Sequence, residues 1–395
     1  MSRNVYVLSA VRTPIGKFLG SFQTLSAVDL GIFAVQAAIE RAGIDALAVD
    51  ELFMGNGRQA GGGPNMARQV AFRAGCGENT PAATVNQACA SGLLAIEMAA
   101  DRIRMGRSEV IVAGGAESMS RLPFFLDQAR TGYRLGHGVM VDGMYKDGFH
   151  CPLCDLKMGE TAENLADQYS ISRLEQDRYA LRSQELCQKA IDEGRFLSEI
   201  VPVAVPRKRK EALVVECDEH PRAGVTLDKL AKLPTVFRKE GTVHAGNSSG
   251  ITDGASALVL ASEDFVRSHG LKPLVSVAES VTVGVDPAIM GIGPVLACST
   301  LEKRSGIPTS AYDVIELNEA FASQVLACFR EMDLDEDRVN PNGGSIALGH
   351  PIGATGARIA GTLIHEMKRR QAENGLATLC VSGGMGIAIR FVLSP

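Results

Sequence analysis

A cysteine at the predicted start of a buried helix is the first residue that could do chemistry. Cys89 lies in the segment Asn86-Gln87-Ala88-Cys89-Ala90-Ser91-Gly92, and residues 90–105 carry apolar side chains on nearly every side, as a buried helix does. The unpaired N–H groups and positive partial charge of a helix N-terminus stabilise a thiolate, so Cys89 is a candidate nucleophile. Taken alone, it could equally be a small cysteine that packs as an apolar side chain.

A histidine among glycines is the second candidate. His350 stands in the segment Gly349-His350-Pro351-Ile352-Gly353-Ala354-Thr355-Gly356, just before a predicted helix. Such a loop lets the backbone come close to a ligand while the imidazole acts as a donor or a base. The alternative is a capped turn with a histidine that faces solvent.

Two further side chains follow predicted strands. Cys380 ends a strand before Gly383-Gly384-Met385-Gly386, and a thiol there can act as an acid or base if its pKa is tuned. Asn318 follows the predicted strand Val314–Leu317 in the segment Asn318-Glu319-Ala320-Phe321, and side-chain amides are common oxyanion donors.

The elements that must position these residues alternate between strands and helices. Ser26 with Asp29 three residues on resembles a capping box, and Gly43 predicts the end of the helix that follows it. The predicted order is strand 4–11, a helix to Ala42, strand 51–55, helix 90–105, and strand 109–113 running into Gly114-Gly115. This alternation predicts a layered α/β domain with parallel strands.

The last third of the chain repeats this pattern after a long insertion. Residues 122–249 hold Pro-rich and charged segments with one amphipathic helix near 175–193, and the α/β pattern resumes with a strand at 257–260. Three segments of the first third have a counterpart in the last third: Val49-Asp50 corresponds to Tyr312-Asp313, Val85-Asn86 to Val339-Asn340, and the strand before Gly114-Gly115 to the strand 378–381. Such duplication predicts two similar α/β halves. The expected domains are 1–121 with 250–272, the insertion 122–249, and 273–395.

Composition narrows the class of protein. Of 395 residues, 46% are hydrophobic and 22% charged, which allows a large core, and the net charge of −5 argues against a nucleic acid partner. Nine cysteines, an odd number, without a signal-type segment predict free thiols and a cytoplasmic location. The apolar runs are shorter than a membrane span, so no membrane association is expected.

Together, the four segments resemble the thiolase family. Further matching motifs are Arg12-Thr13-Pro14-Ile15-Gly16, Gly114-Gly115-Ala116-Glu117-Ser118-Met119 and Ala245-Gly246-Asn247-Ser248-Ser249-Gly250. The resemblance covers essentially the whole chain, and agreement across independent segments is hard to obtain by chance. It implies two similar five-stranded halves layered α-β-α-β-α, with a long loop-domain insertion. It also implies an enzyme that makes or breaks a carbon–carbon bond between acyl groups carried on coenzyme A.

The resemblance also implies a role for each catalytic residue. Cys89 takes the acyl group from a first acyl-CoA, and His350 activates it. His350, with a water held by Asn318, then stabilises the enolate of a second acyl-CoA, whose α-proton Cys380 removes and returns. Backbone N–H groups of Cys89 and Ser382 form a second oxyanion hole. Many thiolases have glycine where Ser382 stands, so this serine requires a negative φ.

Substrate-binding residues follow from the same resemblance. Met158 and Met290 match methionines that line the acyl pocket, although methionines also fill ordinary cores. Ser249 matches a pantetheine contact, and Arg222 a basic residue near the nucleotide end of CoA, where a guanidinium suits phosphate. Phe321 is expected to belong to the same site.

Within the family, the segment around Met158-Gly159 and the long insertion favour the biosynthetic, short-chain type, which joins two acetyl-CoA into acetoacetyl-CoA and also runs the reverse thiolysis. The alternative is a degradative, broad-chain 3-ketoacyl-CoA thiolase, which shares the catalytic residues. Lys157, where a histidine often stands, leaves the acyl-chain preference open. A ketoacyl synthase would have a histidine in place of Asn318 and lack Cys380, and a non-enzymatic carrier would lose Cys89, His350 or Cys380.

The expected partners are acyl-CoA, CoA and further copies of the chain in a homotetramer. CoA is substrate and product, so no cofactor is expected. No metal is expected either, because the pair Cys151-Pro152-Leu153-Cys154, although beside His150, has no second pair to complete a zinc site. The basic run 207–210 is interpreted as a solvated turn, with steering of anionic CoA as the alternative. Gly55-Asn56-Gly57 does not form a dinucleotide fingerprint.

Overall fold

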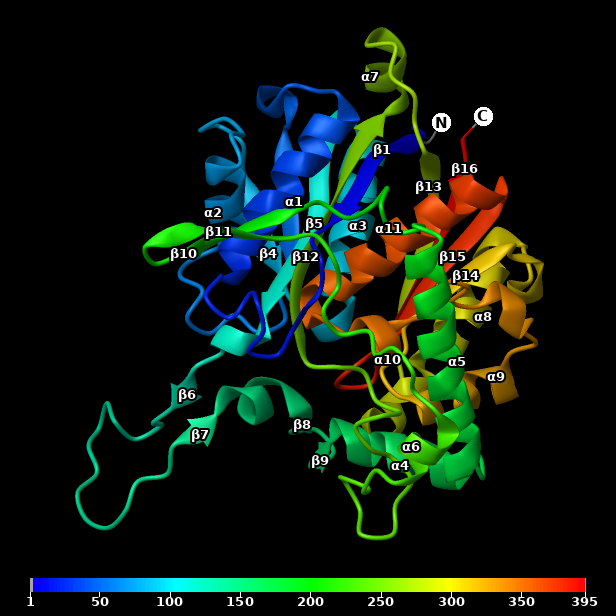
Figure 1. The fold of residues 1–395 in the computed structure, drawn as a ribbon. Coiled ribbons are helices and arrows are strands. Elements are labelled where there is room, and N and C mark those ends of the chain that lie inside the picture. The colour runs from blue at the N-terminus through cyan, green and yellow to red at the C-terminus, as the bar shows by residue number, and fades with distance from the viewer. Residues whose placement is uncertain (1–2, 395) are drawn as a thin grey trace.

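The computed structural model describes residues 3–394 and is built around one large mixed sheet (Figure 1). Its strands are β1 (Val5–Arg12), β2 (Gly16–Lys17), β3 (Glu51–Gly55), β4 (Ala82–Val85), β5 (Val110–Ser118), β12 (Thr252–Ser262), β13 (Val275–Gly284), β14 (Val314–Leu317), β15 (Asn374–Val381) and β16 (Met385–Leu393). They lie in the order β14-β15-β16-β13-β1-β12-β5-β3-β4, with β2 paired to β12.

The two halves of this sheet repeat one pattern. In the first, β3 is parallel to β5, and β12 lies antiparallel between β5 and β1. In the second, β14 is parallel to β15, and β16 lies antiparallel between β15 and β13. The halves join where β1 pairs with β13. The predicted fold class is confirmed, although the counterpart of β4 is only a single bridge between Ile315 and Val339.

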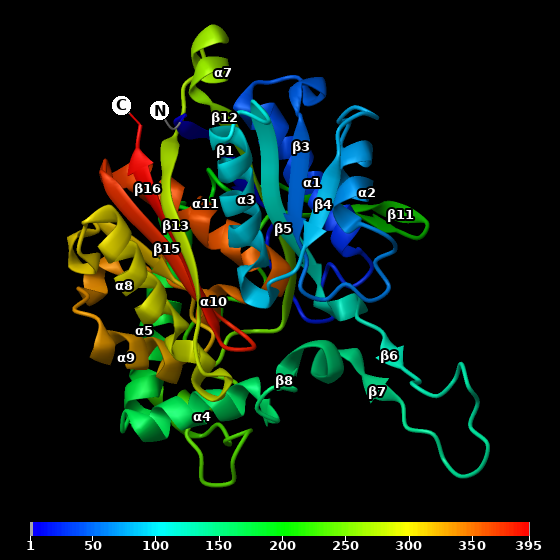
Figure 2. The same ribbon diagram turned by 180° about the vertical axis from the view of Figure 1, so that it is seen from behind.

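Helices complete the layers. They are α1 (Ala27–Ala42), α2 (Met66–Arg73), α3 (Ser91–Arg104), α7 (Glu263–Ser268), α8 (Gly293–Ser305), α9 (Ala322–Glu331), α10 (Ser345–Leu348) and α11 (Ile352–Arg370). In both views α3 and α11 lie in the middle, with α1 and α2 outside one half and α8 and α9 outside the other (Figures 1 and 2). The central helices share one apolar core with strands of both halves. In β5, Ile111 and Ala113 face this core, while Val110 and Val112 face α1, so both faces of the strand are buried.

The alternation of strands and helices predicted parallel strands, and this prediction is wrong for part of the sheet. β12 enters after the long insertion rather than after a single crossover helix, and it runs antiparallel to both neighbours. β15 and β16 are joined by a short turn, which can connect only antiparallel strands. Alternation of apolar and polar residues along a strand indicates which side chains are buried, but it does not indicate whether the strand runs parallel or antiparallel to its neighbours.

The prediction that a strand ends at Gly114-Gly115 is wrong, because β5 continues to Ser118. Both glycines lie inside the strand, where the sheet and a helix come very close. A Cβ on Gly115 would lie 1.9 Å from the carbonyl oxygen of Gly353 in α11, and one on Gly114 would lie 2.2 Å from that of Ser256. The glycines therefore permit close contact of backbones instead of ending the strand.

The insertion wraps around the open ends of both halves. Its helices are α4 (Met158–Gln168), α5 (Arg173–Asp192) and α6 (Leu227–Ala231), and its strands are β6 (Phe124–Phe125), β7 (Val141–Asp142), β8 (His150–Cys151), β9 (Leu156–Lys157), β10 (Val203–Arg207) and β11 (Lys210–Val215). α5 matches the predicted amphipathic helix, while α4 and α6 were not predicted. The residues around β6 and β7 form an extended arm that leaves the body of the molecule in both views (Figures 1 and 2).

Candidate active site

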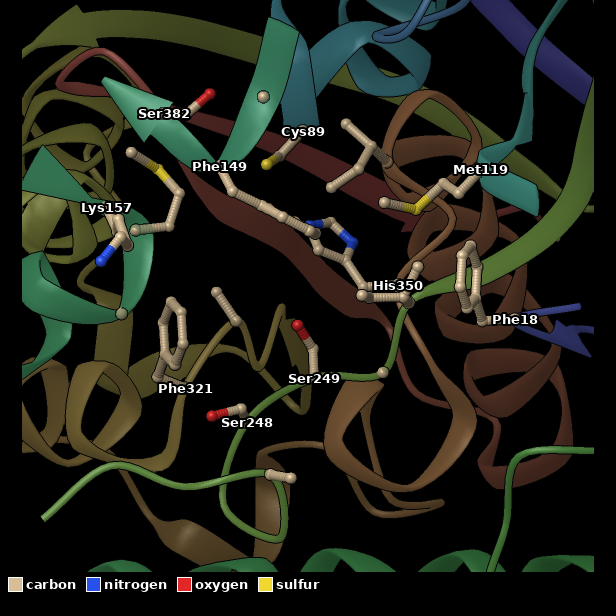
Figure 3. Close-up of a pocket in the computed structure, with 18 of the residues that line it drawn as sticks. Phe18, Cys89, Met119, Phe149, Lys157, Ser248, Ser249, Phe321, His350 and Ser382 are labelled. Atoms are coloured by element: carbon tan, nitrogen blue, oxygen red, sulfur yellow. The ribbon is translucent and has the colours of Figure 1, made fainter. Parts of the chain in front are cut away.

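A cavity of about 520 Å³ brings together all but one of the residues that the sequence singled out. It lies between the two sheet halves and the insertion. Figure 3 shows the Cys89 sulfur pointing into a space bordered by Phe149, His350 and Phe321. The predicted residues on its wall are Cys89, Met158, Arg222, Ser249, Met290, Phe321, His350, Cys380 and Ser382. Asn318 is fully buried behind this wall.

Cys89 lies in a short 3₁₀ turn, Ala88–Ala90, immediately before α3. Ala88 has a φ of 46°, a left-handed conformation that few non-glycine residues adopt. Its N–H donates to Asn86 Oδ1 at 2.9 Å, and the Ser91 hydroxyl donates to the Ala88 carbonyl at 2.7 Å. Burial raises the pKa of the Cys89 thiol, while Arg58 and the backbone N–H groups of Ser382 and Cys89 act to lower it. The two N–H groups predicted as oxyanion donors thus both hydrogen-bond to the Cys89 sulfur.

His350 is held in one tautomer. Its Nδ1 lies 2.6 Å from Thr355 Oγ1, and the Thr355 hydroxyl donates to the Pro351 carbonyl at 3.0 Å. While that hydroxyl donates its only proton to the Pro351 carbonyl, it accepts from His350, which places the imidazole proton on Nδ1. Burial, with the charges of Arg358 and Arg58, lowers the pKa of His350 to about 3. The ring is therefore neutral at pH 7, and its unprotonated Nε2 has no partner among residues 3–394.

Asn318 is oriented by a buried relay. The Arg358 guanidinium donates to Ser345 Oγ at 2.6 Å, and the Ser345 hydroxyl donates to Asn318 Oδ1 at 2.6 Å. An arginine can only donate, so Ser345 Oγ accepts from Arg358 and keeps its own proton for Asn318 Oδ1, which orients the amide. Asn318 Nδ2 is left as a buried donor that no described residue satisfies. A water or a substrate oxygen would satisfy it, as the predicted role of Asn318 requires.

Cys380 is the last residue but one of β15 and is almost fully buried. Burial and the neighbouring Cys89 raise the pKa of its thiol well above the usual value. The turn that follows has φ of 92° at Gly383 and 83° at Gly384, whereas φ at Ser382 is not positive. The conformational requirement for a serine at this position is therefore met, and its N–H remains available to the site.

The acyl side of the cavity is apolar. Met158 is the first residue of α4, Met290 lies in the turn before α8, and both pack with Phe321 and Cys380 in one buried cluster. Phe237 meets Phe321 edge to face, with ring centroids 6.3 Å apart. Glu160 accepts a hydrogen bond from the Lys157 N–H at 2.6 Å and so fixes the start of α4, which presents Met158 to the cavity.

The polar mouth of the cavity is formed by the insertion and the N-terminal loop. Ser249 is anchored by its N–H, which donates to the Ala320 carbonyl at 2.9 Å, and Arg222 is exposed. In Figure 3, Lys157 lies on the same side as Phe321, and Phe18 lies on the other. Basic side chains and a histidine line this cavity in addition to His350, namely Lys17, Arg58, Lys157, His220 and Arg222. Among the described residues of the wall, none is Asp or Glu.

Several cavity residues were missed from the sequence. Phe149 and His220 lie in the insertion, where no periodic pattern marks them. Arg58 follows Gly55-Asn56-Gly57, a segment considered only as a possible dinucleotide motif. A signal did exist, since Arg58 comes just after the carboxyl end of the parallel strand β3, and ligands of α/β sheets bind at such ends.

Other features considered in the sequence lie outside this chemistry. All nine cysteines are free thiols. Within residues 3–394, no three His, Cys, Asp or Glu side chains are grouped as metal ligands would be, and His150 Nε2 contacts Asp155 instead at 2.8 Å. No helix of the described chain is both long and apolar enough to span a membrane.

Comparison with known proteins gives the family to which this fold and cavity belong, a family of acyltransferases. The description "Thiolase, N-terminal domain" matches residues 5–264, and "Thiolase, C-terminal domain" matches residues 271–393. The chain belongs to the thiolase family.

Close relatives cover nearly the whole chain. An acetyl-CoA acetyltransferase of Pseudomonas aeruginosa is 48% identical over 387 residues, which is 98% of each chain. The crystal structure of the Bacillus anthracis acetyl-CoA acetyltransferase has a TM-score of 0.98 and 45% identity, covering 100% of this chain and 99% of that one. Human mitochondrial 3-ketoacyl-CoA thiolase in complex with CoA has a TM-score of 0.96 and 41% identity, covering 100% and 98%.

Proposed function

We propose that the protein is an acetyl-CoA acetyltransferase, which joins two acetyl-CoA into acetoacetyl-CoA and CoA and catalyses the reverse thiolysis. The observation that carries this is the meeting of two thiols, Cys89 and Cys380, with the neutral base His350 in one cavity. The relatives from Pseudomonas aeruginosa and Bacillus anthracis support the choice of acetyl-CoA. CoA serves as substrate and product, and no further cofactor is needed for either half-reaction.

In the first half-reaction, Cys89 becomes acetylated. His350 Nε2 takes the proton of the Cys89 thiol, and the sulfur attacks the thioester carbon of acetyl-CoA. The carbonyl oxygen becomes an oxyanion, which the N–H groups of Cys89 and Ser382 stabilise. When the tetrahedral intermediate collapses, CoA leaves as a thiolate and takes the proton back from His350. The new bond is the Cys89 thioester, and the broken one is the thioester of acetyl-CoA.

In the second half-reaction, a carbon–carbon bond replaces that thioester. Cys380 gives its thiol proton to His350 Nε2, and the Cys380 thiolate then removes an α-proton from a second acetyl-CoA. The enolate oxygen accepts hydrogen bonds from the protonated His350 and from a water on Asn318 Nδ2, and His350 returns its proton to Cys380 at the end of the cycle. The enolate carbon attacks the acetyl carbon on Cys89, and Cys89 leaves as a thiolate that regains a proton from Cys380. Acetylation also turns Cys89 into a neutral thioester, which removes one of the three causes that raise the pKa of Cys380, the others being burial and Cys328.

The cavity walls suit an acyl-CoA. The wall near Met158, Met290 and Phe321 is apolar and takes the acyl group, while Ser249 and Arg222 take the pantetheine and phosphate parts. A cationic cavity in a chain of net charge −5 favours an anionic ligand by local rather than global charge.

Thiolysis kinetics across ketoacyl-CoA chain lengths test this proposal. The expected result is a kcat/KM that is highest with acetoacetyl-CoA and falls as the chain lengthens. A kcat/KM that rises with chain length would instead favour a degradative 3-ketoacyl-CoA thiolase, the second candidate, which the similarity to the human mitochondrial enzyme supports. Absence of thiolysis with every ketoacyl-CoA, in a folded protein, would refute both.

We also infer that the protein is a cytoplasmic homotetramer, a dimer of dimers joined by the extended arm. The arm carries large apolar side chains that the single chain leaves exposed, including Phe124 at 55%, Leu135 at 97% and Val139 at 73%. Apolar groups on an extended segment are typical of contacts between copies. Light scattering should give four chains for the native protein and two for Leu135→Asp/Val139→Asp. A native protein that is monomeric would contradict the assignment.

A further inference from the structure

Arg58 is a buried cation in the wall of the catalytic cavity, and the steps described above do not use it. It is 7% exposed and lines the same cavity as Cys89, His350 and Cys380. The loop that carries it lies against the turn of the nucleophile, since Asn86 Nδ2 contacts the Gly57 carbonyl at 3.4 Å, and a Cβ on Gly57 would lie 3.5 Å from the Ala88 carbonyl.

The guanidinium has no carboxylate partner in the described part of the chain. None of the ion pairs there includes Arg58, and its one side-chain hydrogen bond is a weak contact of 3.3 Å from Nη1 to the Gly57 carbonyl. Nε is buried and unpartnered. On one side the Gly148 backbone covers the group, where a Cβ would lie 2.2 Å from Cζ. A buried charge without a partner is unfavourable, so its retention indicates an anion that is present only during function.

Burial raises the pKa of Glu117 and the charge of Arg58 acts to lower it, but no hydrogen bond joins the two side chains, because the Glu117 oxygens are engaged elsewhere. Glu117, in β5, accepts hydrogen bonds from Asn56 Nδ2 at 2.6 Å and from the backbone N–H groups of Gly57, Arg58 and Gly353 at 2.9, 3.2 and 2.8 Å. Both of its oxygens are therefore occupied by the loop and by the start of α11. Glu117 holds the backbone of Arg58 in place but leaves the guanidinium facing the cavity without an ion pair.

We propose that Arg58 is a further functional residue of this active site, which supplies the fixed positive charge that stabilises the Cys89 thiolate. This rests on the proposed thioester chemistry, in which the free thiolate, the oxyanion of the tetrahedral intermediate and the enolate are all anionic. A fixed cation nearby, in a site from which water is largely excluded, lowers the energy of such anions.

The need for such a charge follows from the other groups around Cys89. Burial disfavours the thiolate, and the neutral His350 is a weak base because its pKa is lowered to about 3. Arg58 lowers the pKa of Cys89, which favours the thiolate. It also lowers the pKa of His350, which keeps the imidazole neutral before the proton transfer. The other titratable or charged groups at this site are Glu117, Cys380 and Arg358, and those further along the wall are Lys17, Tyr145, Lys157, His220 and Arg222.

Alkylation of Cys89 by iodoacetamide tests the proposal without any acyl-CoA. The thiolate displaces iodide, so the rate against pH reports the pKa of Cys89, and mass spectrometry of the Cys89 peptide excludes signal from other thiols. Arg58→Met removes the charge at similar length, Arg58→Lys keeps it, and Arg107→Met makes the same exchange at an exposed site as a control. The assay can succeed even if the acetyltransferase proposal fails, so the two are distinguishable.

The expected result is a pKa of alkylation about one unit or more higher in Arg58→Met, so that the rate at pH 7 falls about tenfold and recovers at higher pH. Arg58→Lys and Arg107→Met should keep the native profile. The thermal midpoint of Arg58→Met should not fall, because an unpaired buried charge is removed. An unchanged alkylation profile in Arg58→Met would overturn the proposal. This holds even if KM for acyl-CoA rises in that variant, because the arginine would then bind substrate without acting on the Cys89 thiolate. A lower thermal midpoint with an unchanged profile would likewise show a purely structural arginine.

Discussion

Thr355 should control the reactivity of Cys89 without touching it. Its hydroxyl holds the His350 proton on Nδ1 at 2.6 Å and so leaves Nε2 free to act as the base. Thr355→Val keeps the shape of a fully buried side chain but removes the acceptor, so a buried N–H of His350 would lose its partner. The imidazole would then shift toward the tautomer with its proton on Nε2, which cannot accept the proton of Cys89.

The size of the effect follows from the hydrogen bond. Leaving a buried donor unsatisfied costs roughly 1–3 kcal/mol. Since ~1.4 kcal/mol corresponds to about a tenfold change in rate, the acetylation of Cys89 should slow about 10-fold or more. The variant should also lose roughly 1–3 kcal/mol of unfolding free energy, since the hydrogen bond to the Pro351 carbonyl is lost as well. A domain of ordinary stability remains folded after such a loss.

Single-turnover acetylation measures this directly. Enzyme in excess over acetyl-CoA is quenched at intervals, and the acetylated Cys89 peptide is quantified by mass spectrometry. Thr355→Ser is the matched control, because it keeps the hydroxyl and should acetylate at close to the native rate. If Thr355→Val acetylates as fast as Thr355→Ser, the tautomer argument is refuted.

Three further predictions test other parts of the structure. Cys89→Ala should abolish turnover, and the acetyl group of the native enzyme should be found on Cys89; an acetyl group on Cys380 with Cys89 unmodified would reverse the two roles. Cys380→Ser should still acetylate Cys89 yet lose condensation by about 10²–10⁴-fold, since only the proton transfer at the second substrate is removed, whereas equal loss of both half-reactions would contradict separate roles. Burial would raise the pKa of Glu366, but hydrogen bonds from Arg369, Asn342 and Arg370 outweigh it and lower the pKa to about 2. Because a depressed carboxyl pKa stabilises the fold above the unfolded value, and because solvent screens the part-exposed Arg369 and Arg370, Glu366→Gln should cost about 1–2 kcal/mol at pH 7. In urea unfolding this difference should fade as pH drops from about 4.5 to about 2, and a difference independent of pH would disprove it.

The local elements followed closely from the sequence. The helix predicted after Ser26 is α1, with Ser26 as its N-cap, the capping box to Asp29 formed, and Gly43 left-handed at a φ of 68°. These signals lie within a few residues of one another, and the hydrogen bonds that they describe form within the segment itself. The start of the buried helix near Cys89 is local in the same sense, and so is the strand that carries Cys380.

Other features needed contacts between distant segments. Gly115 was interpreted as the end of a strand, because nothing near it in sequence indicates that Gly353 would come so close. The Ser345 hydroxyl lies beside the Asn318 amide, and the loop that carries Arg58 lies beside the turn of Cys89. Each of these contacts joins parts of the chain that no periodic pattern connects.

The sequence by itself determined where α1 begins and ends, that the helix after Cys89 is buried, and which side chains are chemically able to act. Only the tertiary structure decided the directions of β12 and β16, the tautomer of His350, the orientation of the Asn318 amide and the unpaired state of the Arg58 charge. The physical reason is the separation along the chain of the groups that interact. Burial patterns and caps are set by neighbours along the chain, whereas the protonation and orientation of a buried polar group depend on whichever distant atoms the folded chain brings to hydrogen-bonding distance.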